Sequence, residues 1–403
     1  MRRGRGGAPE AGAQRPGAVV LGSDYRGLAV VRSLGRRGLP VCVLIHGDDV
    51  LAAKSRYATY GVKLRGTTED EQCEFLLDLA ERLDLRRWVL FPTADETAAL
   101  VARSHEQLAA QFQLTSPPWR TLRWAHDKRL TYQLAESTGL SYPRTWSAES
   151  TSEAAELDVD FPVIVKPAIR EEFNRLTAAK AWRVDDREAL RNRFAEAAEL
   201  LDPELLLIQE VIPGNENFSY AALCRHGEPL AKVVARRTRQ YPPDFGRAST
   251  FVETIDEPEV AALGERCLAA IDFDGLAEVE FKRDPRDGKL KLLDVNPRVW
   301  GWHSLCQRAG VDFPYLAYRL ARGETVPASR AGVGVRWLRP STDLPTSLKQ
   351  VVQGKLPLLP YLRTLASRHE SAVFARDDPW PGIVELPMLA GTLMRRLRLG
   401  SGV

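Results

Sequence analysis

Residues 275–298 read GLAEVEFKRDPRDGKLKLLDVNPR, two apolar runs on either side of a segment rich in Asp, Pro and Gly. The runs predict two strands, and the segment between them predicts a hairpin turn. Because side chains alternate between the faces of a strand, Glu278 and Glu280 share one face. Asp294 and Asn296 likewise share a face of the second strand. Hairpin strands are antiparallel neighbours, so we expect Glu280, Asp294 and Asn296 to converge.

The converging side chains offer oxygen ligands. Hard cations such as Mg²⁺ prefer oxygen ligands, commonly one or two carboxylates together with nucleotide phosphates. Glu280, Asp294 and Asn296 therefore indicate a Mg²⁺ site, in which Mn²⁺ would be a substitute. Taken alone, Glu280 fits equally well on the polar outer face of a half-exposed sheet.

A lysine follows another apolar run. Lys166 comes directly after Pro-Val-Ile-Val at 162–165, where a core strand would not tolerate an ammonium group. Burying a charge costs several kcal/mol unless it is paired. Phosphate is a common partner for such a lysine, so Lys166 indicates a phosphate site.

Length and composition set the class of protein. The chain has 403 residues, with 56 Lys and Arg against 53 Asp and Glu, for a net charge of +3. This length predicts two to three domains, and the balanced charge argues against nucleic-acid binding. The five cysteines form no CxxC pair, which favours a cytoplasmic protein without zinc. No long apolar run occurs, so we expect no membrane span. Residues 1–16 are interpreted as a disordered basic tail.

Residues 17–115 alternate short apolar runs with helical periodicity. This alternation predicts a doubly wound α/β domain with a parallel sheet. A Gly-x-Gly-x-x-Gly motif is absent. Ligands of such sheets bind at the carboxyl ends of strands. The residues expected there are Gly22, Ser23, Asp24, Thr93, Asp95 and Glu96.

The remaining chain predicts a second architecture. Ser116-Pro-Pro118 marks a boundary, and a helix is expected over 121–138. Strand-like runs with turn signals then predict an α+β region with antiparallel sheets. Residues 331–403 are expected to form a helical extension, ending in a basic helix at 389–399. That helix would contact a membrane surface or a second subunit, or pack back on the body.

Four motifs recur in order: Asp127-Lys128, Val163-Ile-Val-Lys166-Pro, Ile208-Gln-Glu-Val-Ile-Pro-Gly214-Asn-Glu216, and Glu280 followed by Asp294-Val-Asn296-Pro-Arg298. Together they resemble the ATP-grasp superfamily over about residues 17–325. The resemblance implies an α/β parallel-sheet (pre-ATP-grasp) domain at 17–115. A two-lobed α+β ATP-grasp domain would follow at 116–330.

The resemblance also implies roles for single residues. Lys128 and Lys166 would contact the phosphates of ATP. Glu216 would hold the ribose, and Arg298 would stabilise the transferring phosphoryl group. The hinge between the lobes would be Gln209, Glu210, Val211 and Ile212, with the backbones of Glu210 and Ile212 at the adenine. Glu280, Asp294 and Asn296 would bind one or two Mg²⁺ ions.

One segment departs from the family pattern. Many relatives have a glycine-rich loop after the second lysine, whereas residues 168–180 contain no glycine. Side chains would replace the backbone amides, or the loop is merely solvated. The candidates are Arg170, Asn174, Arg175, Thr177 and Lys180.

Two further groups of residues are open to two interpretations. Lys232 and Arg236 share a strand face that would point at the nucleotide, giving Arg236 a catalytic role, or they are solvated. Arg239 and Tyr241 would then lie near the acceptor. Trp300, Trp302 and His303 would wall the substrate pocket, or belong to the core.

The favoured function is an ATP-dependent carboxylate–amine ligase that works through an acyl phosphate and releases ADP and phosphate. Its partners would be a small-molecule or peptide carboxylate and an amine, and a homodimer is left open. A non-catalytic nucleotide-binding scaffold is the alternative from another class. A biotin-dependent carboxylase ranks lower, since the chain has no Met-Lys-Met site.

Overall fold

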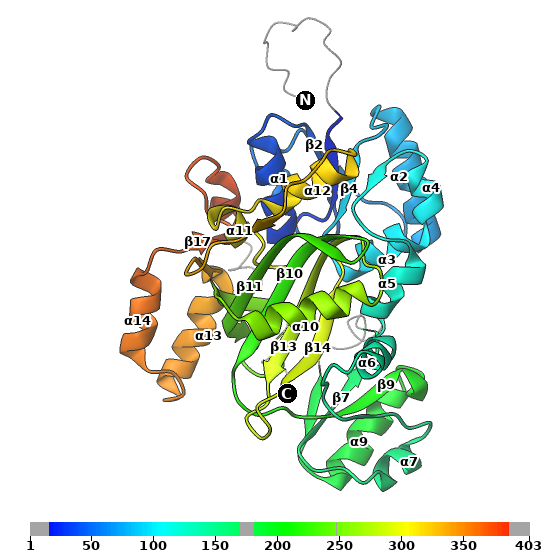
Figure 1. Ribbon diagram of the computed structural model, residues 1–403, viewed down its shortest axis with the longest axis vertical. Coiled ribbons are helices and arrows are strands. Elements are labelled where there is room, and N and C mark those ends of the chain that lie inside the picture. The colour runs from blue at the N-terminus through cyan, green and yellow to red at the C-terminus, as the bar shows by residue number, and fades with distance from the viewer. Residues whose placement is uncertain (1–15, 170–180, 247, 387–403) are drawn as a thin grey trace, which may run out of the picture.

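The structure is a computed structural model that describes residues 16–169, 181–246 and 248–386. Its strands form a parallel sheet near the N-terminus, a small antiparallel sheet and a large, mostly antiparallel sheet. In Figure 1 the large sheet lies between the other two. This layout confirms the predicted fold class, a parallel-sheet α/β domain followed by a two-lobed α+β body.

The parallel sheet has the strand order β3-β2-β1-β4-β5. Ala18 and Val20 of β1 pack with α1, whereas Val19 and Leu21 pack with α2 and α3. Helices therefore cover both faces, which is why its central strands are apolar throughout. The elements are β1 (Ala18–Leu21), α1 (Tyr25–Gly35), β2 (Val41–Ile45), η1 (Ala52–Lys54), β3 (Tyr60–Lys63), α2 (Glu69–Arg82), β4 (Val89–Pro92), α3 (Asp95–Arg103), α4 (His105–Ala109) and β5 (Gln113–Leu114).

A single helix over 121–138 was the wrong prediction. The structure has two helices, α5 (Trp119–His126) and α6 (Lys128–Ser137), with Asp127 between them in an extended conformation. The Asp127 carboxylate accepts from the backbone N–H of Arg129 and so caps α6. The break places Lys128 at the first position of α6.

The small sheet has the order β6-β9-β7-β8 and is antiparallel throughout. Helices α7 and α9 pack together on it through a core that includes Ala154, Leu190 and Phe194. Its elements are β6 (Thr145–Trp146), α7 (Thr151–Glu156), β7 (Val163–Pro167), β8 (Trp182–Val184), α9 (Arg187–Ala198), η2 (Pro203–Leu205) and β9 (Leu206–Glu210). Residues 211–213 lead from β9 toward the large sheet.

The large sheet has the order β14-β13-β10-β11-β12-β16-β17, with β15 paired to β11. Its elements are β10 (Asn217–Arg225), β11 (Glu228–Tyr241), β12 (Ala248–Thr254), α10 (Pro258–Ala269), β13 (Gly275–Arg283), β14 (Leu290–Asn296), α11 (Ser304–Arg308), α12 (Phe313–Ala321), β15 (Ser329–Arg330), β16 (Arg336–Leu338), α13 (Pro340–Val352), α14 (Leu358–Ala366) and β17 (Glu370–Ser371). The chain after residue 330 thus adds β16 and β17 to this sheet, besides the two helices.

The two faces of the large sheet differ. One face packs on α10 through apolar side chains such as Tyr220 and Phe281. On the other face, Leu223 and its neighbours pack with Trp300 and Trp302 in a core shared with the parallel-sheet domain. Further along the same face the apolar residues give way to charged ones, and these charges line a cleft.

Candidate active site

A cleft of about 850 Å³ lies where the small sheet, the hinge and the large sheet meet. Its lining includes Lys128 from α6, side chains from β7 and β9, and side chains from β11, β13 and β14. The charged residues that line it are Lys128, Lys166, Arg183, Arg237, Arg239, Lys282 and Lys355, together with Glu210, Asp244, Glu280 and Asp294. Among the described lining residues cations therefore outnumber carboxylates, which favours an anionic ligand.

The acidic side chains of the hairpin converge as the sequence predicts. Glu280 pairs in register with Asp294, and Glu278 pairs with Asn296. The Asn296 amide donates to Glu280 at 2.9 Å and to Glu278 at 3.2 Å. All four side chains are buried. Burial, with the nearby Glu280 carboxylate, raises the pKa of Glu278 to about 7.

Two cations neutralise the predicted metal ligands. Lys128 Nζ lies 3.0 Å from Asp294 Oδ1, and Arg237 Nη1 lies 2.9 Å from Glu280 Oε2. Lys128, Arg237 and both carboxylates are buried, so each charge has a partner in a low-dielectric site. Phosphate groups entering the cleft could exchange with the carboxylates as partners of these cations.

Lys166 is buried, and its hydrogen-bond partners in the described part of the chain are neutral groups. Its Nζ donates to the hydroxyl of Tyr132 at 3.0 Å and to Oε1 of Gln209 at 2.7 Å. Burial, followed by repulsion from Lys128, lowers the pKa of Lys166 to about 7. An anion beside this ammonium group would raise that pKa and hold the lysine in its charged form.

Arg298 is held between the cleft and the parallel-sheet domain. Its guanidinium makes two hydrogen bonds to Asp95, at 2.8 and 3.2 Å, and one to Asn296 Oδ1 at 3.0 Å. Asp95 is thus the residue at the carboxyl edge of the parallel sheet that reaches the predicted site. Asp24 instead caps α1, and the Thr93 hydroxyl donates to the carbonyl of Leu21.

The hinge residues line the cleft, and two of them already make contacts. The Glu210 N–H donates to the carbonyl of Arg144, and its carboxylate receives Arg286 at 2.9 Å. The Ile212 carbonyl accepts from Lys282 Nζ at 2.7 Å. An adenine contact at this hinge would therefore fall to the Glu210 carbonyl and the Ile212 N–H.

Glu216 was expected at the ribose but does not line the cleft. Glu216 is exposed and has Arg283 as its nearest ionic partner, at 3.9 Å, although Asn215 and Asn217 on either side line the cleft. Lys180 and the other candidates of segment 170–180, like the basic helix at 389–399 and nearly all of the N-terminal tail, fall outside the described residues.

Lys232 and Arg236 share a strand face as predicted, but that face does not line the cleft, so the catalytic role expected for Arg236 is wrong and the alternative interpretation holds. Lys232 forms an ion pair with Glu265 of α10, and Arg236 is half-exposed beside Glu253. Ala235 pairs with Ser219, and Ser219 pairs with Glu280. Odd-numbered residues of this part of β11, including Arg237, therefore share the face of Glu280. Even-numbered Arg236 lies on the opposite face.

The aromatic run after Arg298 belongs mainly to the core. Trp300 and Trp302 are buried, and Trp302 donates its indole N–H to Glu278 at 2.8 Å. His303 is also buried, its Nε2 lies 3.0 Å from the Arg26 carbonyl, and burial lowers its pKa to about 4. These residues therefore support the site from behind.

The sequence did not predict that Arg237, Glu278 or three C-terminal residues would belong to the site. Arg237 lines the cleft, and Glu278 is a buried acid that accepts from the Trp302 indole. The C-terminal residues that line the cleft are Gln350, Lys355 and Leu356. The alternation in β13 already put Glu278 on the correct face. Nothing in the local sequence ties residues 350–356 to the cleft.

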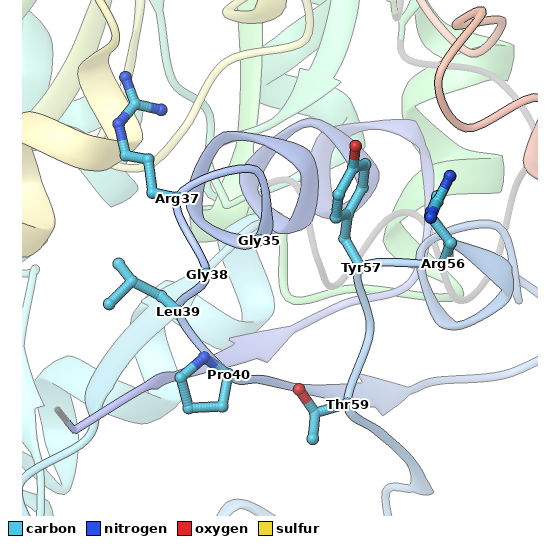
Figure 2. Close-up of a pocket in the computed structure, with 8 residues that line it drawn as sticks. All are labelled: Gly35, Arg37, Gly38, Leu39, Pro40, Arg56, Tyr57 and Thr59. Carbon is cyan, nitrogen blue, oxygen red and sulfur yellow. The ribbon is translucent and has the colours of Figure 1, made fainter. Parts of the chain in front are cut away.

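Figure 2 shows a second hollow of about 450 Å³ at the end of α1, lined by Gly35, Arg37, Gly38, Leu39, Pro40, Arg56, Tyr57 and Thr59. It lies at the amino ends of β2 and β3, away from the cleft. Arg37 is paired with Asp312 at 2.6 Å and stacks on Tyr315. Because the predicted residues Lys128, Lys166, Glu280 and Asp294 line the cleft and not this hollow, the cleft is the better candidate site.

The donor set of the cleft suits a hard cation. Glu280 and Asp294 offer carboxylate oxygens, and the Asn296 amide oxygen has a second lone pair beside the one that accepts from Arg298. Within the described ranges, no cluster of three or more His, Cys, Asp or Glu side chains could hold a metal by itself. A Mg²⁺ ion here would therefore share its coordination with the amide and with ligand phosphates.

Residues 202–340 match a family model described as ATP-grasp in the biosynthetic pathway with Ter operon. The chain is 23% identical to a D-aspartate ligase of Enterococcus faecium (strain Aus0004) over 304 residues, and the match covers 70% of each protein.

None of the helices that the structure describes is long and apolar enough to cross a membrane.

Solved structures share the fold. An L-amino acid ligase from Bacillus licheniformis superposes with a TM-score of 0.62 at 15% identity, covering 77% of this chain and 75% of that one. An ADP complex of N5-carboxyaminoimidazole ribonucleotide synthetase gives a TM-score of 0.63 at 12% identity, covering 84% and 85%. The family match thus covers residues 202–340, and over most of its length the chain shares its fold with these two enzymes.

Proposed function

We propose that this protein is an ATP-dependent ligase that joins a small-molecule or peptide carboxylate to an amine. The observation that carries the proposal is the meeting of Lys128, Lys166 and Arg237 with Glu280 and Asp294 in one cleft at the hinge. Phosphoryl transfer depends chiefly on positioning and charge stabilisation, and these side chains supply both.

The nucleotide would lie along the hinge. Lys128 and Lys166 would hold the phosphates, and the backbone of Glu210 and Ile212 would receive the adenine. Mg²⁺, held by Glu280, Asp294 and Asn296, would neutralise phosphate charge. Phosphate binding would favour the charged form of Lys166, whose present partners are the neutral groups of Tyr132 and Gln209.

The reaction would have two steps. A carboxylate oxygen of the first substrate would attack the γ-phosphorus, and the bond to ADP would break to leave an acyl phosphate. The amine nitrogen would then attack the acyl carbon, lose a proton and expel phosphate. Arg298 and Arg237 would stabilise the charge on the transferring group, so no covalent protein nucleophile is required.

Release of ADP from Mg-ATP tests this proposal. The purified protein would be assayed with pairwise mixtures of the standard L-amino acids, D-alanine and D-aspartate, and products would be identified by mass spectrometry. We expect at least one pair to raise ADP release above that with ATP alone and to yield an amide. No amide from any mixture would contradict the proposal and favour a non-catalytic nucleotide binder.

A variant pair links that activity to the cleft. Asp294→Ala removes a proposed metal ligand, and we expect it to lower turnover by about 10²–10³-fold. Asp287→Ala is the matched control, because Asp287 lies on the exposed turn between the same strands, contacts Lys289 and Lys291, and does not line the cleft. Equal activity of Asp294→Ala and the control would refute the metal-site assignment.

A further inference from the structure

The chain after residue 330 reaches the cleft. Gln350 from α13, and Lys355 and Leu356 from the turn that follows it, line the same cleft as Lys166 and Glu280. This segment lies beyond the last family motif of the sequence. Figure 1 shows α13 and α14 side by side at one edge of the large sheet.

A buried ion pair holds α13 in place. Asp343 is fully buried, and its carboxylate accepts from Arg239 of β11 at 2.8 and 3.0 Å and from the Thr250 hydroxyl at 2.7 Å. The Arg239 guanidinium also lies over the ring of Phe251, 4.4 Å from its centroid. Because breaking a buried pair is costly, α13 is fixed relative to the cleft.

The turn after α13 is itself well defined. The backbone N–H groups of Lys355 and Leu356 both donate to the carbonyl of Gln350, at 2.9 and 3.2 Å. Gly354 has a φ of +69°, a left-handed conformation that closes a helix end and that glycine adopts without strain. Lys355 therefore projects from a hydrogen-bonded turn on a fixed helix, and this limits the entropy lost on binding a ligand.

The Lys355 ammonium group is available to a ligand. The side chain is exposed, and in the described part of the chain no carboxylate is paired with it. Under the proposed function, Lys128, Lys166 and Arg237 serve the phosphates of ATP. Lys355 comes from the turn after α13 and not from the elements that carry those three cations. It is therefore suited to bind an anion other than the phosphates. Leu356 and Phe245 add apolar surface to the lining.

From these contacts we infer that the turn after α13 is a subsite for the second substrate, in which Lys355 binds a carboxylate of that substrate. The inference rests on the proposed ligase function for the identity of the ligand. It gives the segment after residue 330 a role in substrate selection. Lys355 is thus a specificity residue, and Asp343 with Arg239 are positioning residues that hold its helix.

Lysine footprinting tests the subsite without requiring turnover. The full chain would be acetylated with an amine-reactive ester in the presence of Mg²⁺ and a non-hydrolysable ATP analogue, with or without a mixture of L-amino acids, D-aspartate and D-glutamate. We expect the mixture to slow labelling of Lys355 several-fold, because a bound carboxylate covers its ammonium group. Lys349 is the control, since it is exposed on α13 and does not line the cleft.

Each footprinting outcome decides between the claims. Unchanged labelling of Lys355 with the mixture overturns the subsite, whether or not the protein forms an amide. Protection by the ATP analogue alone also overturns it, because the lysine would then contact nucleotide. Protection by the mixture without amide formation keeps the subsite and contradicts the ligase proposal.

If a substrate pair is found, steady-state kinetics of a Lys355 variant test the subsite a second time. Lys355→Ala should raise the KM of the carboxylate-bearing substrate about tenfold, the size of one charge-assisted hydrogen bond, with kcat and the KM for ATP changed less than about twofold. Lys349→Ala should match the wild type in all three. An unchanged substrate KM in Lys355→Ala would refute the assignment.

Discussion

Two clusters of buried charge in this molecule differ in how their charges are paired. The C-terminal anchor joins Asp378 to α1 and η1: its carboxylate accepts from Arg32 Nε, the Ser55 hydroxyl and the Arg56 N–H, at 2.7–3.0 Å. The cleft cluster comprises Lys128, Lys166, Arg237, Glu280 and Asp294. There the hydrogen-bond partners of Lys166 among the described residues are neutral groups, and the ion pairs line a cavity.

The difference separates a structural network from a binding site. In the anchor, each oxygen of Asp378 has a donor. Neither Asp378 nor Arg32 lines the cleft or the hollow of Figure 2, although Arg56 lines that hollow, so the buried ion pair serves to hold the segment around Asp378 to the parallel-sheet domain. In the cleft cluster the cations line a cavity, and under the proposed function they would exchange their carboxylate partners for phosphate. Buried charge by itself therefore does not mark a functional site; exchangeable partners beside a cavity do.

The largest expected effect is on stability at the anchor. Asp378→Ala would leave Arg32 buried without its carboxylate and should lower the free energy of unfolding by about 3–5 kcal/mol. Denaturant unfolding followed by circular dichroism measures this. Asp377→Ala, at a half-exposed neighbour that pairs with Arg36, should cost about 1 kcal/mol or less. If both variants lost the same free energy of unfolding, Asp378 would not be a structural anchor, and the contrast between the anchor and the cleft cluster would fail.

The next effect concerns the face of β11. Arg237→Met removes the partner of Glu280 and a cation from the cleft, so ATP turnover should fall about 10²–10³-fold. Arg236→Met should retain turnover within about twofold, because Arg236 lies on the opposite face. Initial rates of ADP release compare them. A greater loss in Arg236→Met would restore the original expectation for that residue.

A smaller effect is expected at Lys166. Lys166→Met should weaken binding of a non-hydrolysable ATP analogue by about 10–100-fold, through loss of charge-assisted hydrogen bonds to phosphate. Isothermal titration calorimetry measures the affinity. Lys289→Met, at an exposed position on the hairpin turn, is the control. Unchanged affinity in Lys166→Met would remove this lysine from the nucleotide site.

The smallest effect is a pH dependence. Burial lowers the pKa of Lys166 to about 7, so in the free protein the lysine loses its charge as the pH rises through that value. A bound phosphate favours the charged form. Affinity for the ATP analogue should therefore fall as the pH rises from about 6 to about 9, by at most about tenfold per unit. The same titration on Lys166→Met should lack this decline; an identical slope would contradict the assignment to Lys166.

Much of the fold and of the candidate site was predictable because its signals are local. Alternation within β13 and β14, and the turn between them, predicted that Glu280, Asp294 and Asn296 would meet, and the register confirms it. The break at Asp127 was not predicted, because the helical periodicity continues through it. Only the capping contact to Arg129 shows where α6 begins.

The sequence by itself determined the order of the two architectures, the resemblance to the ATP-grasp superfamily and the face shared by the acidic residues, because these follow from motif order and from a period of two along a strand. The tertiary structure alone decided three things. It showed which basic residue of β11 faces the cleft, because that depends on pairing between strands: Ser219 meets Ala235 and Glu280, which turns Arg237 inward. It tied Asp95 to Arg298. It also brought Lys355 to the cleft, because a contact between segments far apart in the chain leaves no trace in either local pattern.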